Sequence, residues 1–162
     1  TRRKSSPLLL GSNHNLSAEN FAGITCGIER KLEENRDFCA EFDLGEEITF
    51  EFEPALVERL RLVFDNDIAR ESYPPAMFNE KMYPNRCHVR KNRSKVFIPK
   101  TLVKSYTVKV KVGEEWKELY STEENRHRLN YVEIGREISG IKLIPRESYG
   151  CEKARIYSID VL

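Results

Sequence analysis

The stretch RLRLVFDNDIAR, residues 59–70, alternates apolar side chains with others and then ends in two aspartates and an arginine. Apolar residues at every second position are typical of a β-strand with one buried face. The face expected to point inward carries Leu60, Leu62 and Phe64, and the opposite face carries Arg59, Arg61 and Val63. The stretch therefore predicts a half-buried strand whose end presents Asp65, Asp67 and Arg70 to the segment that follows.

The same alternation recurs along the chain. It is clearest in ITFEFE at 48–53 and SYTVKVKV at 105–112, and it is shorter at 115–121, 130–134, 138–144 and 154–162. Polar or glycine-containing turns are expected at 112–115, 121–127 and 144–150, and a short helix at 17–23. Short strands at this spacing, with little helix between them, predict an all-β fold, an antiparallel β-sandwich of jelly-roll type.

The amino-acid composition argues against several classes of binding partner. The chain has 27 basic and 26 acidic residues, so no strong field favours nucleic acid or an anionic membrane. No apolar run approaches the roughly 20 residues that a membrane-spanning helix needs. The length of 162 residues suits one domain. Because the sequence begins at Thr1, and Met77 and Met82 lie far inside it, we expect residues 1–162 to be a single domain excised from a longer chain.

Four cysteines, Cys26, Cys39, Cys87 and Cys151, are present without a C-x-x-C pair. This spacing argues against a structural zinc site. Two disulfides in an oxidising compartment stay possible, but buried reduced thiols are the favoured interpretation. Cysteine usage thus favours a cytoplasmic location without excluding a secreted one.

Residues 70–99 form a long segment with almost no periodicity, predicted to be a functional or structural loop. Aromatic rings next to basic groups suit stacking on a sugar and hydrogen bonding to its hydroxyls. The candidate ligand-binding residues are Tyr73, Tyr83, Arg86 and His88. The alternative is that these rings only pack the loop onto the sheet.

The residues at the end of the 59–70 strand are interpreted as a fastening for this loop. We expect Asp65, Asp67 and Arg70 to form a structural polar cluster, joined by Arg128 or Tyr106 from neighbouring strands. A hydrolase using Asp65 and Asp67 as paired carboxylates is the competing hypothesis. No third chemical group is identified for it, so no catalytic residue is assigned.

Several blocks together resemble a known family: ENFAGITCGIER, ITFEFE, RLRLVFDNDIAR, PKTLVKSYTVKV, NRHRLNYVEI, ISGIKLI and ARIYSIDVL. From about Pro7 to Leu162 the chain resembles the C-terminal β-sandwich domain of many bacterial FAD-dependent oxidoreductases. That domain is similar to galactose-binding-like or discoidin (coagulation-factor type C) domains, whose loops at one end bind glycans or other surfaces. In glycan-binding relatives an Asp-Gly step often helps to hold a structural calcium. Here Phe21-Ala22-Gly23 stands in its place, which argues against calcium.

The resemblance implies a non-catalytic accessory domain, with FAD held in a neighbouring catalytic domain of the same chain. The sequence itself has no G-x-G-x-x-G turn for a dinucleotide, so no cofactor is expected in this domain. The alternative function is a carbohydrate-binding module of a secreted glycan-active enzyme, and a small independent enzyme is a third. Carbohydrate is therefore a candidate partner beside the neighbouring domain.

Overall fold

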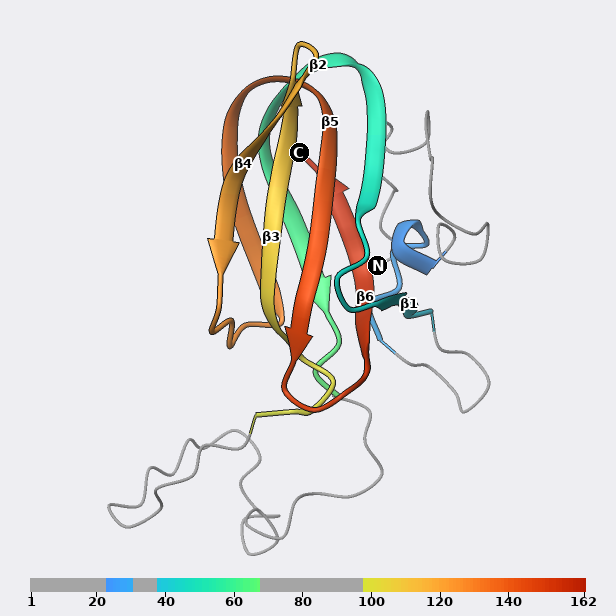
Figure 1. The fold of residues 1–162 in the computed structure, drawn as a ribbon. Helices are drawn as coiled ribbons and strands as arrows, with labels where there is room; N and C mark the ends of the chain where they lie inside the picture. Colours follow the sequence, from blue (N-terminus) through green and yellow to red (C-terminus); the bar gives the residue numbers. More distant parts are fainter. Residues whose placement is uncertain (1–22, 31–37, 68–97) are drawn as a thin grey trace, which may run out of the picture.

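The computed structural model describes residues 23–30, 38–67 and 98–162, which form six β-strands and a short helical stretch at 23–25 (Figure 1). The strands are β1 (Ala40–Asp43), β2 (Ile48–Phe64), β3 (Val103–Val112), β4 (Glu115–Thr122), β5 (Leu129–Ser148) and β6 (Lys153–Val161). The prediction of an all-β antiparallel fold is confirmed. The described helical residues are 23–25, whereas the sequence suggested that a helix ends at Gly23.

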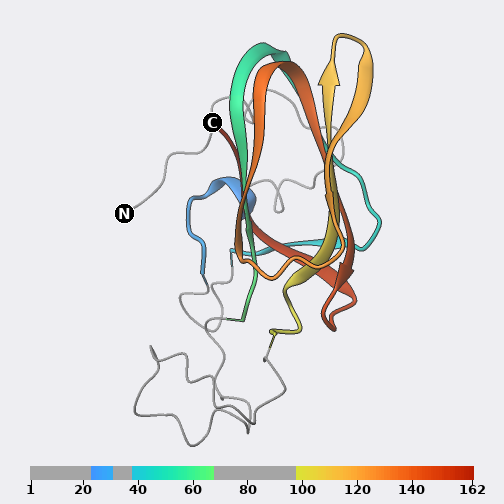
Figure 2. The ribbon, with the colours of Figure 1, turned by 90° about the vertical axis from the view of Figure 1, so that its left-hand side faces the viewer.

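All the strands pair antiparallel in one sheet of order β1-β6-β2-β5-β3-β4. The sheet becomes a sandwich because its two long central strands bend. Both β2 and β5 arch over at one end, so each contributes one limb to each layer (Figure 2). The first half of β2 pairs with the second half of β5 beside β3, and the second half of β2 lies between β5 and β6.

The bend corrects the strand boundaries expected from the sequence. Segments 48–53 and 59–64 are one strand, as are 130–134 and 138–144. Pro54 lies where the β2–β5 register shifts, which suits a residue that has no N–H to give to the ladder. Gly135, with φ of 59°, lies at the second shift. The predicted turn at 144–150 is shorter than expected, because β5 continues to Ser148.

The core lies between the layers and is built mainly from Leu, Ile, Val and aromatic side chains. Leu60, Leu62 and Phe64 point into it as expected, and the ring of Tyr106 packs 5.1 Å from that of Phe64. The predicted single-sided burial of the 59–64 strand is wrong, however. Arg61 and Val63 on the outer face are also buried, because residues 23–30 lie against that face of β2 and β6.

Candidate binding site

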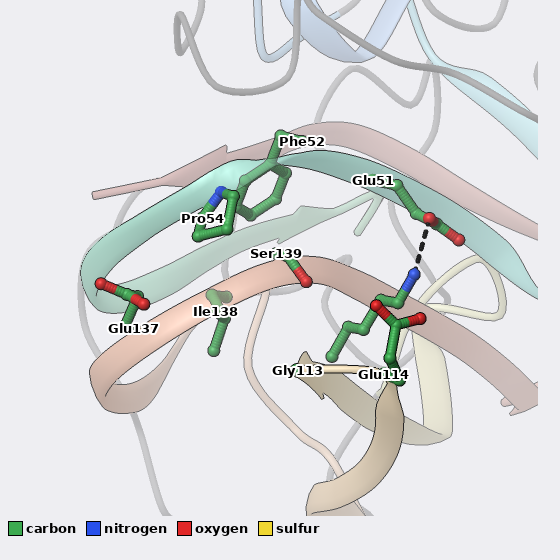
Figure 3. A pocket seen from close by; sticks show the side chains of 9 residues that line it. Glu51, Phe52, Pro54, Gly113, Glu114, Glu137, Ile138 and Ser139 are labelled. Carbon is green, nitrogen blue, oxygen red and sulfur yellow. Dashed lines mark hydrogen bonds and ion pairs between the residues drawn. The ribbon is translucent and has the colours of Figure 1, made fainter.

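A pocket of about 320 Å³ lies at the arched end of the sandwich, and we call it the apical pocket. It lies where β2 and β5 bend, next to the β3–β4 turn (Figure 3). The turn is the one predicted at 112–115, with Gly113 at φ of 63°. The lining residues are Glu51, Phe52, Pro54, Lys111, Gly113, Glu114, Glu137, Ile138 and Ser139.

The apical pocket has an apolar side and a polar side. Phe52 and Pro54 lie together on β2, with Phe52 also packed against the core. On the opposite side, Lys111 donates a hydrogen bond to Glu51 across 3.0 Å. The hydroxyl of Ser139 points toward this pair and toward Glu114 in Figure 3. An apolar surface facing hydroxyl, amine and carboxylate groups is suited to a small polar ligand with one apolar face.

The pocket carries more acid than base. The hydrogen bond and charge of Glu51, together with the nearby charge of Glu114, raise the pKa of Lys111 above its ordinary value. Lys111 therefore stays protonated and paired. No described residue forms an ion pair with Glu114 or Glu137, which stand on opposite sides of the pocket in Figure 3. Three carboxylates and one ammonium leave the lining negatively charged.

A second polar arrangement adjoins the pocket on the outer face of the β5–β3–β4 layer. Trp116 from β4 reaches across the sheet to Gly140, and the Lys142 ammonium lies 4.7 Å from the centre of its ring. The same ammonium donates to Glu47 at 2.7 Å, and this hydrogen bond lowers the pKa of Glu47. The indole is thus held by neighbouring side chains.

The loop residues predicted to bind ligand, Tyr73, Tyr83, Arg86 and His88, lie outside the described residues, as does Arg70. Their roles stay predictions. The described chain leaves the sandwich at Asp67 and returns at Ile98, at the end opposite the apical pocket (Figure 1).

Two members of the predicted polar cluster contact one another. The Asp65 carboxylate accepts the backbone N–H of Asp67 at 2.9 Å and lies 3.0 Å from Nε of Arg155. Asp67 has φ of 53°, a left-handed conformation that aspartate tolerates in turns. With Asp65 only 5% exposed and its oxygens engaged, the geometry favours a fastening over an acid–base pair.

Arg128 belongs to a different group of residues on the outer face of β2 and β6. Its guanidinium donates to the backbone oxygen of Glu29 and lies over the Tyr157 ring. The Glu29 carboxylate in turn accepts two hydrogen bonds from Arg61, at 2.7 and 3.0 Å. Arg128 and Arg61 thus both bind Glu29.

Asp160 completes the contacts of Arg61. Its carboxylate accepts a hydrogen bond from Arg61 at 2.9 Å and another from the Ser158 hydroxyl at 2.8 Å. Burial alone would lower the pKa of Arg61, but the hydrogen bonds that Arg61 donates to Glu29 and Asp160, together with the charges of these carboxylates, outweigh it and raise the pKa above its ordinary value. These contacts fasten residues 23–30 to the sheet.

Sequence reasoning missed Arg155, Glu29 and Asp160 as members of these clusters. Their spacing along the chain gives no signal, because each contact joins residues at least 32 positions apart. It also missed the apical pocket, although Pro54 between two apolar alternations was a usable sign of a bend.

Cys26 and Cys151 are free thiols in the structure, Cys39 is partly buried, and Cys87 lies outside the described residues. Within the described ranges, no group of three or more His, Cys, Asp or Glu side chains is placed to hold a metal ion. The expectation of no calcium and no cofactor stays a prediction. None of the helical residues described here forms a segment long and apolar enough to cross a membrane.

Comparison with known proteins supports the fold. No family model matches the sequence, and no curated protein matches it. Among solved structures, the family 32 carbohydrate-binding module from Streptococcus pneumoniae EndoD is similar, with a TM-score of 0.60 and 14% identity over 94% of this chain and 90% of that chain. The CpGH89CBM32-4 structure from Clostridium perfringens has a TM-score of 0.51 and 13% identity over 93% and 92% of the two chains.

A third similar structure, GH31 CBM32-2 bound to GalNAc, has a TM-score of 0.50 and 16% identity over 80% of this chain and 70% of that chain. At these identities the likeness concerns the fold. The class of structure expected from the sequence, a galactose-binding-like β-sandwich, is therefore confirmed.

Proposed function

We propose that this chain is a non-catalytic carbohydrate-binding domain. The observation that carries the proposal is the likeness to the EndoD module, which extends over 94% of the chain at a TM-score of 0.60. A second similar structure is bound to GalNAc. Sugar binding by this chain is an inference from shared architecture, supported by a pocket whose apolar and hydrogen-bonding sides suit a sugar.

A binding domain of this kind acts as an accessory to a catalytic domain, and we propose such a neighbour in the same protein. The sequence resemblance pointed first to an FAD-dependent oxidoreductase. The similar structures give no support to that attachment, and the glycan-binding alternative fits them better.

Two surfaces are candidates for the ligand. One is the apical pocket, and the other is the loop predicted to use Tyr73, Tyr83, Arg86 and His88. The two candidate surfaces use different residues, so substitutions can separate them. Alanine at Tyr73 or Tyr83 should weaken sugar binding if the loop stacks on the ligand, and should leave it unchanged if those rings only pack on the sheet.

The test is a glycan array followed by calorimetric titration of the purified chain with each glycan that binds, including GalNAc and galactose. We expect weak but saturable binding with dissociation constants of roughly 0.1–1 mM, equivalent to about 4–5.5 kcal/mol. Absence of binding to every glycan at millimolar concentration would refute the proposed function.

A further inference from the structure

A second pocket, of about 540 Å³, lies where β3 begins and β4 and β5 end, away from the arched end of the sandwich. We call it the hydroxyl pocket, and its lining includes Lys104, Ser105, Ser121, Glu123, Arg146 and Glu147. We propose that it binds the acidic group of a charged glycan, a carboxylate or a sulfate ester. The inference rests on the proposed function and adds a site and a ligand class to it.

The hydroxyl pocket opens on the outer face of the layer formed by β3, β4 and β5. Thr107 alternates along β3 with Tyr106 and Val108, which point into the core, so its hydroxyl lies on the outer face. This hydroxyl accepts a hydrogen bond from Nε of Arg146 at 2.9 Å and lies 3.2 Å from the Ser121 hydroxyl. The Arg146 guanidinium is therefore held against the sheet at the pocket.

The contacts of Thr107 decide which proton faces the pocket. Thr107 is fully buried, and among the described residues only Arg146 and Ser121 bond to its side chain. Because a guanidinium has no acceptor, the Thr107 proton can be donated only to Ser121, and a buried proton without an acceptor is costly. Ser121 accepts that bond, so its own proton is left for a ligand.

A second hydroxyl, that of Ser105, reaches the pocket from an irregular part of β3. The register between β3 and β5 shifts on both sides of Ser105, and such irregularities turn a side chain in a new direction. Ser105 is only 5% exposed and lines the pocket, yet no described residue forms a hydrogen bond with its hydroxyl. A buried hydroxyl without a partner is unfavourable, and a ligand oxygen in the pocket would supply the missing bond.

The charges around the pocket leave one cationic group available. Lys104 is paired with Glu147 at 2.6 Å, and Glu124 accepts a hydrogen bond from Arg126 at 3.4 Å. By contrast, no described residue accepts a hydrogen bond from the terminal amino groups of Arg146. A guanidinium with two neighbouring hydroxyl donors matches the oxygens of a carboxylate or a sulfate, which only accept hydrogen bonds.

Glu123 gives the inference a test of sign. It lines the pocket, is exposed and forms no ion pair with any described residue. Its charge repels an anion in the pocket, whereas that of Arg146 attracts one. Neutralising Glu123 should therefore strengthen the binding of an acidic sugar, and neutralising Arg146 should weaken it. A neutral sugar would not respond to the two changes with opposite signs.

The experiment compares two neutral sugars with their acidic counterparts by calorimetry: galactose with galacturonic acid, and GalNAc with GalNAc 6-sulfate. At about pH 7 both acidic groups are ionised. At low salt we expect at least one acidic sugar to bind roughly three- to tenfold more tightly than its neutral counterpart, and added salt to remove most of the difference. The pair that shows the preference distinguishes a carboxylate from a sulfate. No preference in either pair would overturn the inference.

Substitutions then locate the site. Arg146→Gln should abolish the preference for the acidic sugar, and Glu123→Gln should increase it roughly twofold. Ser105→Ala should reduce it roughly twofold without lowering the stability of the fold, because its hydroxyl has no protein partner to lose. The matched control is Arg136→Gln, which should change nothing. Arg136 is also an exposed arginine of β5 whose Nε donates to a nearby oxygen, but it lies beside the apical pocket.

The inference and the proposed function can fail separately. If neutral sugars bind and the acidic sugars have no advantage, the inference is wrong and the proposed function stands. The same holds if an acidic sugar binds more tightly but Arg146→Gln keeps that preference, because the acidic group then binds elsewhere. If no sugar, neutral or acidic, binds at millimolar concentration, both are wrong.

Discussion

Gly140 and Trp116 meet on the outer face of the sheet so closely that a methyl group on Gly140 would lie 2.9 Å from Cη2 of the indole. The same methyl group would lie 2.9 Å from the backbone oxygen of Phe50. The indole has a flexible side chain and can move aside, but the Phe50 carbonyl belongs to the β2 ladder and cannot do so easily. Glycine is therefore required here for space, since its φ is not in the left-handed region.

Gly140→Ala should lower the free energy of unfolding by about 1–3 kcal/mol, because it overpacks a closely fitted site. It should also displace the indole from Lys142. Trp116 is the only tryptophan, so its fluorescence reports this movement directly, and we expect a shift to longer wavelength as the ring becomes more exposed to water. Urea unfolding followed by fluorescence and by circular dichroism measures both effects.

Glu118→Ala is the matched control, because Glu118 is an exposed residue of β4, the strand that carries Trp116. It should leave both the emission and the stability within about 0.5 kcal/mol of the unmodified chain. An unchanged emission spectrum in the Gly140→Ala variant would contradict the close approach of the two residues.

The sequence predicted the strands that carry Gly140 and Trp116, but it did not predict the contact between the two residues. SYTVKVKV places Val108 and Val110 on one face by simple alternation, and the structure buries both. Alternation assigns faces, but it does not say which residue of one strand stands opposite which residue of another. The Gly140–Trp116 contact depends on the register of β3 against both β4 and β5, which is set by the whole sheet.

The same reasoning explains the buried outer face of β2. The alternation gives Arg61 the position of a solvent-facing residue, but in the structure it is buried and contacts both Glu29 of the 23–30 segment and Asp160 of β6. Such a partner is distant in sequence and has no periodic signal. Sequence reasoning therefore identified one buried face of the sandwich and missed the second.

The two carboxylate partners of Arg61 should differ in their contribution to stability. Asp160→Ala should lower the free energy of unfolding by about 3–5 kcal/mol, because it breaks a buried ion pair and removes one of the two carboxylates that balance the charge of Arg61. Glu29→Ala should cost less, since the Glu29 side chain is 24% exposed and that of Asp160 only 8%. Urea unfolding measures the two variants, with Arg30→Ala as the control for an exposed charge in the same segment.

A local readout separates the two roles further. Glu29→Ala should release residues 23–30 from the sheet and speed alkylation of Cys26, which lies in that segment and is partly buried. Peptide mass spectrometry distinguishes Cys26 from the other cysteines. A Glu29 variant as destabilising as Asp160→Ala, with unchanged labelling of Cys26, would show that the fastening interpretation is wrong.

Asp65 and Arg155 should behave as a coupled pair. The two side chains approach to 3.0 Å, and the exposed fraction of the side chain alone is 6% for Asp65 and 26% for Arg155. Asp65→Ala and Arg155→Ala should each destabilise the fold, and the double variant should lose less than the sum by about 0.5–3 kcal/mol. A double-mutant cycle in urea tests this. The corresponding cycle with Asp65→Ala and Arg70→Ala tests the pairing that the sequence predicted. Strictly additive losses in both cycles would show that Asp65 is coupled to neither arginine, and the fastening interpretation would be wrong.

Asn125 holds the connection between β4 and β5 through a buried side chain. Its amide nitrogen donates to the backbone oxygens of Val103 at 2.8 Å and His127 at 3.0 Å, and its oxygen accepts the His127 N–H at 3.0 Å. Asn125→Ala removes all three bonds and should cost about 1–3 kcal/mol. Asn130 provides the matched control, because it also donates to the His127 oxygen but at an exposed position.

Asn125→Asp is the sharper variant, because it changes one donor into an acceptor without changing the shape. At neutral pH it places a carboxylate oxygen against the Val103 and His127 oxygens, so it should destabilise the fold more than Asn125→Ala does. The excess should shrink below about pH 4, where a protonated aspartate can donate again. Thermal unfolding at several pH values, with amide exchange of His127, measures the effect. If Asn125→Asp is as stable as Asn125→Ala at neutral pH, then the amide nitrogen does not face the two carbonyl groups.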